Sequence, residues 1–112
     1  MRRGEFRWFR FDAPDKRRPV LLLGPLNDLD AFLQIPVVPL TTQPRDLPWE
    51  VALGPEDGLP SMSFLKPEWI RSVEKALLGP FIAELPRERW AEVCRAVNLA
   101  LGLSTMGDGT GR

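Results

Sequence analysis

The sequence predicts a mainly β domain, in which short strands form a small, strongly bent barrel or half-barrel and one helix follows near the C-terminal end. Three observations support this prediction. The 112 residues are about the size of one domain. The 12 prolines and 9 glycines indicate many turns, yet their share stays below that of low-complexity chains. Several short apolar runs precede a single amphipathic segment of helical length.

Five short segments have the pattern of strands. Each is rich in apolar, aromatic or β-branched residues, and turn residues separate one from the next. We expect strands within residues 6–11, 19–23, 35–40, 49–53 and 63–73. Pro67 should interrupt the last segment, because proline cannot donate a hydrogen bond to a neighbouring strand. Further prolines at or inside these patterns favour short, bent strands with exposed edges; they are Pro36, Pro39 and Pro48.

The segment from Pro86 to Leu101 predicts the helix. Its apolar residues fall on one face, and Pro86 is acceptable at a first helical position. Gly102 is a plausible stop signal. We interpret Cys94 and the apolar helix face as core. Residues 104–112 are small, polar and glycine-rich, so we expect a flexible tail there and a folded domain over residues 1–103. A further helical turn is expected at residues 30–33, after a turn that begins at Gly24.

The composition excludes several kinds of site. Histidine is absent and Cys94 is the one cysteine, so zinc sites of cysteine and histidine, Ser-His-Asp triads, Cys-His pairs and intramolecular disulfides lack their residues. No phosphate-binding glycine motif is present. We therefore expect neither a cofactor nor a metal. The chain shows neither a signal-peptide pattern nor an apolar run of about 18 residues, so we expect a cytoplasmic protein that does not contact membranes.

Positive charge gathers near the start of the chain. The whole chain has a formal net charge of zero, which argues against indiscriminate nucleic-acid binding. Residues 1–18, however, contain seven basic and three acidic residues. Twelve of the 15 basic residues are arginine, whose planar guanidinium matches a phosphate group. GC-rich coding is the alternative explanation of this arginine usage.

Three stretches contain the candidate functional residues. They are RRPVLLL at 17–23, VVPLTTQPRDLPWEVALG at 37–54 and SFLKPEWIRSVEK at 63–75. Taken singly, each is typical of an ordinary strand. Together with Gly4-Glu5, their order and spacing resemble those of the PemK/MazF family of toxins from toxin-antitoxin systems. The resemblance spans residues 4 to about 103.

This resemblance implies a small Src-homology-3-like barrel of the CcdB/PemK/MazF type that forms a homodimer. It implies a metal-independent endoribonuclease that cleaves single-stranded RNA, often messenger RNA, in a prokaryotic cell. The expected partner is a cognate antitoxin whose acidic, disordered segment covers the basic groove. The family also implies DNA binding by the toxin-antitoxin complex.

The catalytic positions of the family fall on Arg18 and Thr41. Attack by the 2′-hydroxyl of the RNA itself fits a chain without histidine, because it requires alignment and stabilisation of the phosphate. Arg18 would donate paired N–H groups to the phosphate oxygens, and the Thr41 hydroxyl would position the phosphate or the attacking group. We expect Lys16, Arg17 and Gln43 to contact the RNA.

Some alternatives remain open from the sequence. The general base is unidentified: Glu5, Asp12 and Asp15 are the nearby carboxylates, and each is more simply a salt-bridge partner of an arginine. Trp49 or Trp69 could stack on an RNA base. The same fold could also serve a toxin without enzymatic activity, such as a gyrase poison, or a catalytically dead RNA-binding module.

Overall fold

Seven strands and one α-helix form the part of the chain that the computed structural model describes, residues 1–12 and 16–103. The strands are β1 (Glu5–Phe11), β2 (Lys16–Leu22), β3 (Gln34–Thr41), β4 (Val51–Leu53), β5 (Ser63–Leu65), β6 (Arg71–Glu74) and β7 (Phe81–Glu84). Four short 3-10 helices connect them: η1 (Pro55–Asp57), η2 (Pro67–Trp69), η3 (Lys75–Leu77) and η4 (Arg87–Arg89). The helix α1 (Trp90–Ala100) follows η4.

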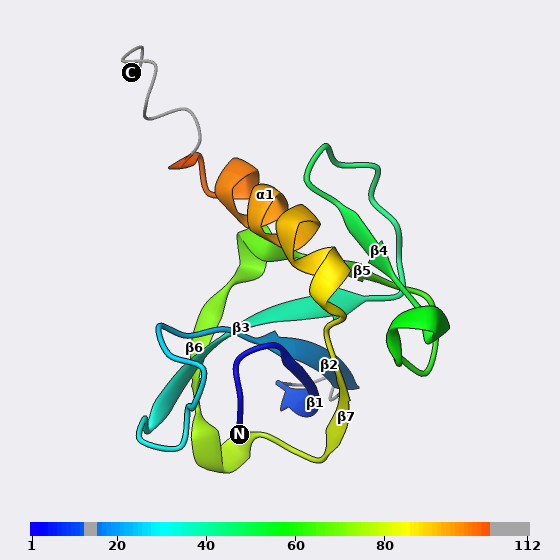
Figure 1. Ribbon diagram of the computed structural model, residues 1–112. Coiled ribbons are helices and arrows are strands. Elements are labelled where there is room, and N and C mark those ends of the chain that lie inside the picture. Colours follow the sequence, from blue (N-terminus) through cyan, green and yellow to red (C-terminus); the bar gives the residue numbers. More distant parts are fainter. Residues whose placement is uncertain (13–15, 104–112) are drawn as a thin grey trace.

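The strands form one curled antiparallel sheet in the order β4-β5-β3-β2-β1-β7, and β6 also pairs with β3. β3 is the central strand, with β2 along one edge and with β6 and then β5 along the other. The sheet curls into a half-barrel, and α1 lies across the side that contains β4 and β5 (Figure 1). The predicted fold class, mainly β with a C-terminal helix, is confirmed.

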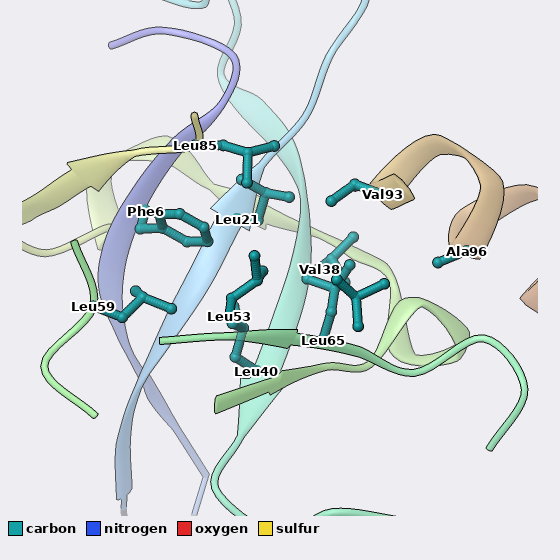
Figure 2. Packing of buried hydrophobic residues seen from close by; sticks show 11 residues of the cluster. Phe6, Leu21, Val38, Leu40, Leu53, Leu59, Leu65, Leu85, Val93 and Ala96 are labelled. Carbon is teal, nitrogen blue, oxygen red and sulfur yellow. The ribbon is translucent and has the colours of Figure 1, made fainter. Parts of the chain in front are cut away.

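β3 is buried on both faces, so it belongs to two hydrophobic clusters. Val38 and Leu40 pack in the first cluster, whereas Ile35 and Val37 pack in the second. This division follows from the pleat, because successive side chains of a strand point to opposite faces. The first cluster fills the space between the sheet and α1, from which Val93 and Ala96 reach the strand residues (Figure 2). The two clusters hold β3 and its neighbours in a fixed register.

β3 contains Pro36 and Pro39 although it is the central strand, so the prediction of exposed edges is wrong for this strand. The carbonyl groups of both prolines still accept hydrogen bonds, from the N–H groups of Leu23 and Lys66, each at 2.9 Å. On this edge the pairing is divided between β6, opposite residues 34–37, and β5, opposite residues 40 and 41. Short partners therefore replace the one continuous ladder that the prolines would interrupt.

Pro67 interrupts the segment 63–73 as predicted, and η2 separates β5 from β6. The predicted strand at 49–53 is shorter, since only Val51–Leu53 pairs. β7 was not predicted, because its four residues show no clear alternation and depend on pairing with β1. Residues 30–33 form no helix; a single turn bond joins the Phe32 N–H to the Leu29 carbonyl at 3.1 Å.

The C-terminal helix differs from its prediction in two ways. Residues 87–89 form the 3-10 helix η4, so α1 begins only at Trp90. Cys94 is exposed and is not part of the core, because the buried positions of α1 are Val93 and Ala96, on a different face. The predicted tail, residues 104–112, lies outside the described residues. Within residues 1–12 and 16–103, no helix is long and apolar enough to cross a membrane.

An ion pair fixes the start of α1 to the loop after β4. The buried carboxylate of Asp57 accepts hydrogen bonds from Arg89 Nη1 at 3.0 and 3.1 Å and from the Gly54 N–H at 3.0 Å. Arg89 also donates to the Ala52 carbonyl at 2.8 Å. The pair therefore joins η1, β4 and the helix at the border of the first cluster.

We predict that Asp57→Asn lowers the free energy of unfolding by about 1–3 kcal/mol, because Arg89 then lacks its buried counter-charge. Urea denaturation measures this change. Glu92→Gln is the matched control, since Glu92 Oε1 also contacts Arg89, at 2.9 Å, but its side chain is 45% exposed. The control should change stability by less than about 1 kcal/mol. Equal losses in the two variants would show that burial of Asp57 is unimportant.

Candidate functional site

The pairing of β2 with β3 brings Arg18 and Thr41 together. Val20 is the register partner of Pro39. Two residues further along both strands, the same antiparallel register places Arg18 opposite Thr41. By alternation, Arg18 follows Val20 and Thr41 follows Val37, and both of these valines belong to the second cluster. The sheet therefore directs Arg18 and Thr41 to the same face.

A hollow of about 270 Å³ lies at this end of the two strands. We call it the Arg18–Thr41 hollow; its lining residues are Trp8, Lys16, Arg17, Arg18, Pro19, Leu40, Thr41, Thr42, Gln43, Pro60, Ser61 and Ser63. All five site residues predicted from the sequence are among them. They come from two strands and from the segment that follows β3, and the structure brings them to one place.

The Arg18 side chain lacks a counter-ion within the described chain. Arg18 is partly buried, and no carboxylate of residues 1–12 or 16–103 forms an ion pair with it. Elsewhere on the sheet, Arg7 binds Glu5 at 2.8 Å and Arg89 binds Asp57 at 3.0 Å. An unpaired, partly desolvated guanidinium favours binding of an anion, and its planar donors match two oxygens of a phosphate.

Arg17 differs from Arg18 because it points to the other face of β2. Its Cζ lies 4.5 Å from the centre of the Trp8 ring, a cation–π contact. Trp8 pairs with Pro19 across the β1–β2 ladder, so the two side chains are diagonal neighbours. Arg17 and Trp8 nevertheless line the Arg18–Thr41 hollow together with Arg18.

The Thr41 hydroxyl is held by the backbone that follows the strand. Thr41 is buried, and its Oγ1 accepts a hydrogen bond from the Gln43 N–H at 3.2 Å. This bond occupies an acceptor position and leaves the hydroxyl proton free to donate. A hydroxyl fixed at the end of a rigid strand can position a phosphate or a sugar oxygen accurately.

A second hollow, of about 550 Å³, adjoins the first and shares Lys16, Arg18 and Leu40 with it. We call it the Trp69 hollow; its lining residues are Phe11, Asp12, Lys16, Arg18, Pro39, Leu40, Lys66 and Trp69. Burial is the largest cause that lowers the pKa of Lys66, followed by the positive charge of Arg45. The charge of Arg18 lowers this pKa further, and Glu68 acts in the opposite direction. Lys66 and Arg18 are therefore close enough to repel each other.

The three carboxylates considered as a base are in different situations. Glu5 is buried, binds Arg7, and lines neither hollow, so its interpretation as a salt-bridge partner is confirmed. Asp12 lines the Trp69 hollow and forms no ion pair with any described residue. Asp15 lies outside the described residues. Of the two carboxylates that lie within the described residues, Asp12 is thus the one that lines a hollow with Arg18.

Sequence reasoning missed Lys66 as a site residue. It stands 25 positions after Thr41 in the chain, and only the pairing of β5 with β3 brings it near Arg18. Its N–H donates to the Pro39 carbonyl, so its place next to β3 is fixed by the sheet. A charged residue directly before the strand-breaking Pro67 was the one signal available.

The tryptophans considered for base stacking differ in their exposure and packing. Trp49 packs against the first cluster, and its Nε1 donates to Glu68 Oε1 at 2.9 Å. Trp90 packs there too. Trp69 is 57% exposed at the rim of its hollow, with the Lys66 ammonium 3.4 Å from its ring centre. Trp69 is therefore the better placed of the two candidates.

A larger hollow, of about 900 Å³, lies elsewhere, between the N-terminal segment and α1. Neither Arg18 nor Thr41 lines it, whereas the exposed Cys94 does. Within the described residues, no three His, Cys, Asp or Glu side chains are grouped so that they could hold a metal ion. The chemistry that the chain itself offers at the Arg18–Thr41 hollow is charge and hydrogen bonding.

Comparison with known families gives one match. The model for the PemK-like, MazF-like toxin of type II toxin-antitoxin system matches residues 2–101. No curated protein matches the chain.

Solved structures share this fold over nearly their full length. The Mycobacterium tuberculosis toxin MazF-mt6 has a TM-score of 0.79 at 24% identity, over 88% of this chain and 96% of that one. An endoribonuclease in complex with its cognate antitoxin, from a mycobacterial species, has a TM-score of 0.74 at 28% identity, over 92% and 96%. A MazE-MazF structure from Deinococcus radiodurans has a TM-score of 0.73 at 25% identity, over 91% and 96%.

Proposed function

This chain belongs to the PemK-like, MazF-like toxins of type II toxin-antitoxin systems, and we propose that it is an endoribonuclease that cleaves single-stranded RNA at the Arg18–Thr41 hollow. The observation that carries this proposal is the meeting, in one hollow, of a fixed hydroxyl and a guanidinium that pairs with no carboxylate of residues 1–12 or 16–103. A phosphodiester offers the anionic oxygens that such a pair recognises. The similar mycobacterial structure of an endoribonuclease with its antitoxin supports the same activity.

The reaction we propose uses the RNA as its own nucleophile. The 2′-hydroxyl gives up its proton, its oxygen bonds to phosphorus, and the bond between phosphorus and the 5′-oxygen breaks. The departing oxygen takes up a proton, so the products are a 2′,3′-cyclic phosphate and a 5′-hydroxyl end. Arg18 donates to the non-bridging oxygens, where negative charge grows in the transition state, and Thr41 aligns the phosphate or the attacking hydroxyl. This route requires no metal and no activated water.

The positive groups around the hollow account for the choice of substrate. Lys16 and Arg17 are exposed, and with Arg18 they form a run of three cations that can follow an RNA backbone. Gln43 is exposed beside Thr41 and can bond to a base edge. The bases of a single strand are accessible to such side chains, whereas the bases of a paired duplex are stacked away from them.

We propose the same two protein partners that the family suggests. One is a second copy of the chain in a homodimer, and the other is an antitoxin with an acidic segment that covers these cations. The mycobacterial endoribonuclease and the Deinococcus protein have both been solved with their antitoxins, which supports the second partner.

The first prediction for this site concerns cleavage itself. Mixed-sequence single-stranded RNA, incubated with the protein and a chelator, should give discrete fragments that end in a 2′,3′-cyclic phosphate. Arg18→Ala and Thr41→Ala should each slow cleavage by about 100-fold or more, because each removes a group that stabilises the transition state. Gel analysis of end-labelled RNA measures the rates. Arg18→Lys should recover only part of the loss, since it keeps the charge but not the planar donors.

The alternatives are outcomes of the same experiment. Intact RNA after incubation would exclude the enzyme, and RNA bound without cleavage would identify a binding module. Inhibition of gyrase without either would identify a poison of the non-enzymatic kind. Loss of cleavage on addition of chelator would contradict the metal-independent route.

The second prediction separates the hydroxyl of Thr41 from its bulk. Thr41→Val keeps the shape but has no hydroxyl, so cleavage should fall by about 100-fold or more. Thr41→Ser keeps the hydroxyl and should stay within about tenfold of the parent rate. Single-turnover rates compare the two variants, and thermal unfolding checks that both fold. Similar rates for the two variants would mean that the hydroxyl takes no part in the reaction.

A further inference from the structure

The Trp69 hollow offers an exposed aromatic surface directly beside the proposed reaction site. Trp69 is 57% exposed although its large ring could have packed in a core. The ring lies at the rim of a hollow whose other members include Arg18 and Lys16, the two cations shared with the Arg18–Thr41 hollow. Phe11 adds a second aromatic side chain to this lining. The volume of about 550 Å³ falls within the usual range for small-ligand pockets.

Hydrogen bonds and packing fix the backbone around Trp69. It ends the 3-10 helix η2, and its N–H donates to the Lys66 carbonyl at 2.9 Å. Pro67 in the same turn is buried, and the following Ile70 packs against the first cluster and donates to the Pro67 carbonyl at 3.2 Å. Little conformational freedom of the backbone is therefore lost when a ligand binds the ring.

Three cations, Lys16, Arg18 and Lys66, and one carboxylate, Asp12, line the Trp69 hollow, so the balance of charge favours an anion next to the ring. The Lys66 ammonium lies 3.4 Å from the ring centre and covers part of one face. The neighbouring carboxylate of Glu68 is turned to other partners, Trp49 Nε1 at 2.9 Å and Arg45 Nη1 at 3.9 Å. Lys66 and Arg18 line the same hollow, and the charge of Arg18 adds to burial and to the charge of Arg45 in lowering the pKa of Lys66, so the two cations repel each other. A phosphate between these two cations would replace that repulsion with attraction.

We propose that the Trp69 hollow is a nucleotide subsite, in which a base next to the cleaved bond stacks on Trp69 and a phosphate lies between Lys66 and Arg18. The inference rests on the proposed function, since the RNA cleaved at Arg18 is the strand that enters the subsite. According to this proposal, Trp69 selects the base at one position of the RNA, next to the cleaved bond. Purines have larger rings to stack than pyrimidines, so this position should favour purines, and the preference should be modest because every base can stack.

Variants of Trp69 test the stacking. Trp69→Leu should weaken binding of short single-stranded oligonucleotides, in which 2′-deoxy sugars block cleavage, by about 10-fold or more. Trp69→Phe keeps an aromatic face and should bind within about threefold of the parent protein. Phe81→Leu is the matched control: Phe81 is an exposed aromatic residue, 53% accessible, that lines neither hollow, and this variant should bind normally. Fluorescence anisotropy of labelled oligonucleotides measures the affinities.

Mapping of cut sites gives the second measurement. With natural RNA, Trp69→Leu should flatten the preference at one position beside the cut, while Phe81→Leu leaves it unchanged. Parent-like affinity and preference in Trp69→Leu would overturn the subsite. If the parent protein binds oligonucleotides through Trp69 but cuts no RNA, the proposed function fails, and the Trp69 hollow is a nucleotide-binding site without a cleaved bond beside it. If the parent protein cuts RNA and the Trp69 variants match it in affinity and in cut-site preference, the subsite fails and the proposed function stands.

The phosphate contact has its own readout. Lys66→Met should weaken oligonucleotide binding and lower the slope of log affinity against log salt concentration by about 0.7, the value for one released counterion on a single strand. Lys75→Met is the control, because Lys75 Nζ instead donates to the Asp30 carbonyl and lines neither hollow. An unchanged slope in Lys66→Met would overturn the phosphate position.

Discussion

The antiparallel pairing of β2 with β3 is the constraint on which the site depends. Arg18 and Thr41 are separated by 22 residues in the chain, and only this register places them opposite each other. The register is held from both faces, because β3 contributes side chains to each hydrophobic cluster. A slip by one residue would turn Arg18 toward the face that Leu21 occupies and would bury apolar side chains wrongly. The packing of the core thus fixes the positions of Arg18 and Thr41 relative to each other.

The distribution of counter-ions separates structural from functional cations. Arg7 and Arg89 each bind a carboxylate that is itself buried. Arg7 also donates to the Gly79 carbonyl, and Arg89 joins the start of the helix to η1, so both connect segments of the fold. Arg18 and Lys66 have no such partner in the described chain and lie close enough to repel each other. Grouped like charges weaken a folded protein unless a ligand neutralises them. A bound polyanion, such as the RNA that we propose as substrate, would supply that neutralisation.

Local sequence patterns were sufficient to predict those features that depend on a single strand, turn or helix. The strand core at 35–40, the break at Pro67 and the end of the helix before Gly102, which has a positive φ, follow from residue type and alternation. Local patterns failed where a neighbouring strand or a packing surface determines the structure. β7 owes its extended form to β1, β3 keeps two prolines in the centre of a sheet because two short strands share its edge, and Cys94 is exposed because Val93 and Ala96 face the sheet.

The sequence by itself determined the types of group available: no histidine, an arginine before a proline, two threonines at a strand end, and an early excess of positive charge. These residues limit the chemistry to charge and hydrogen bonding, whatever the fold. Tertiary structure alone decided which groups meet. Lys66 and Trp69 line a hollow with Arg18 because β5 pairs with β3 and η2 follows β5 directly. Contacts across a sheet depend on register and curl, which no local spacing in the chain encodes.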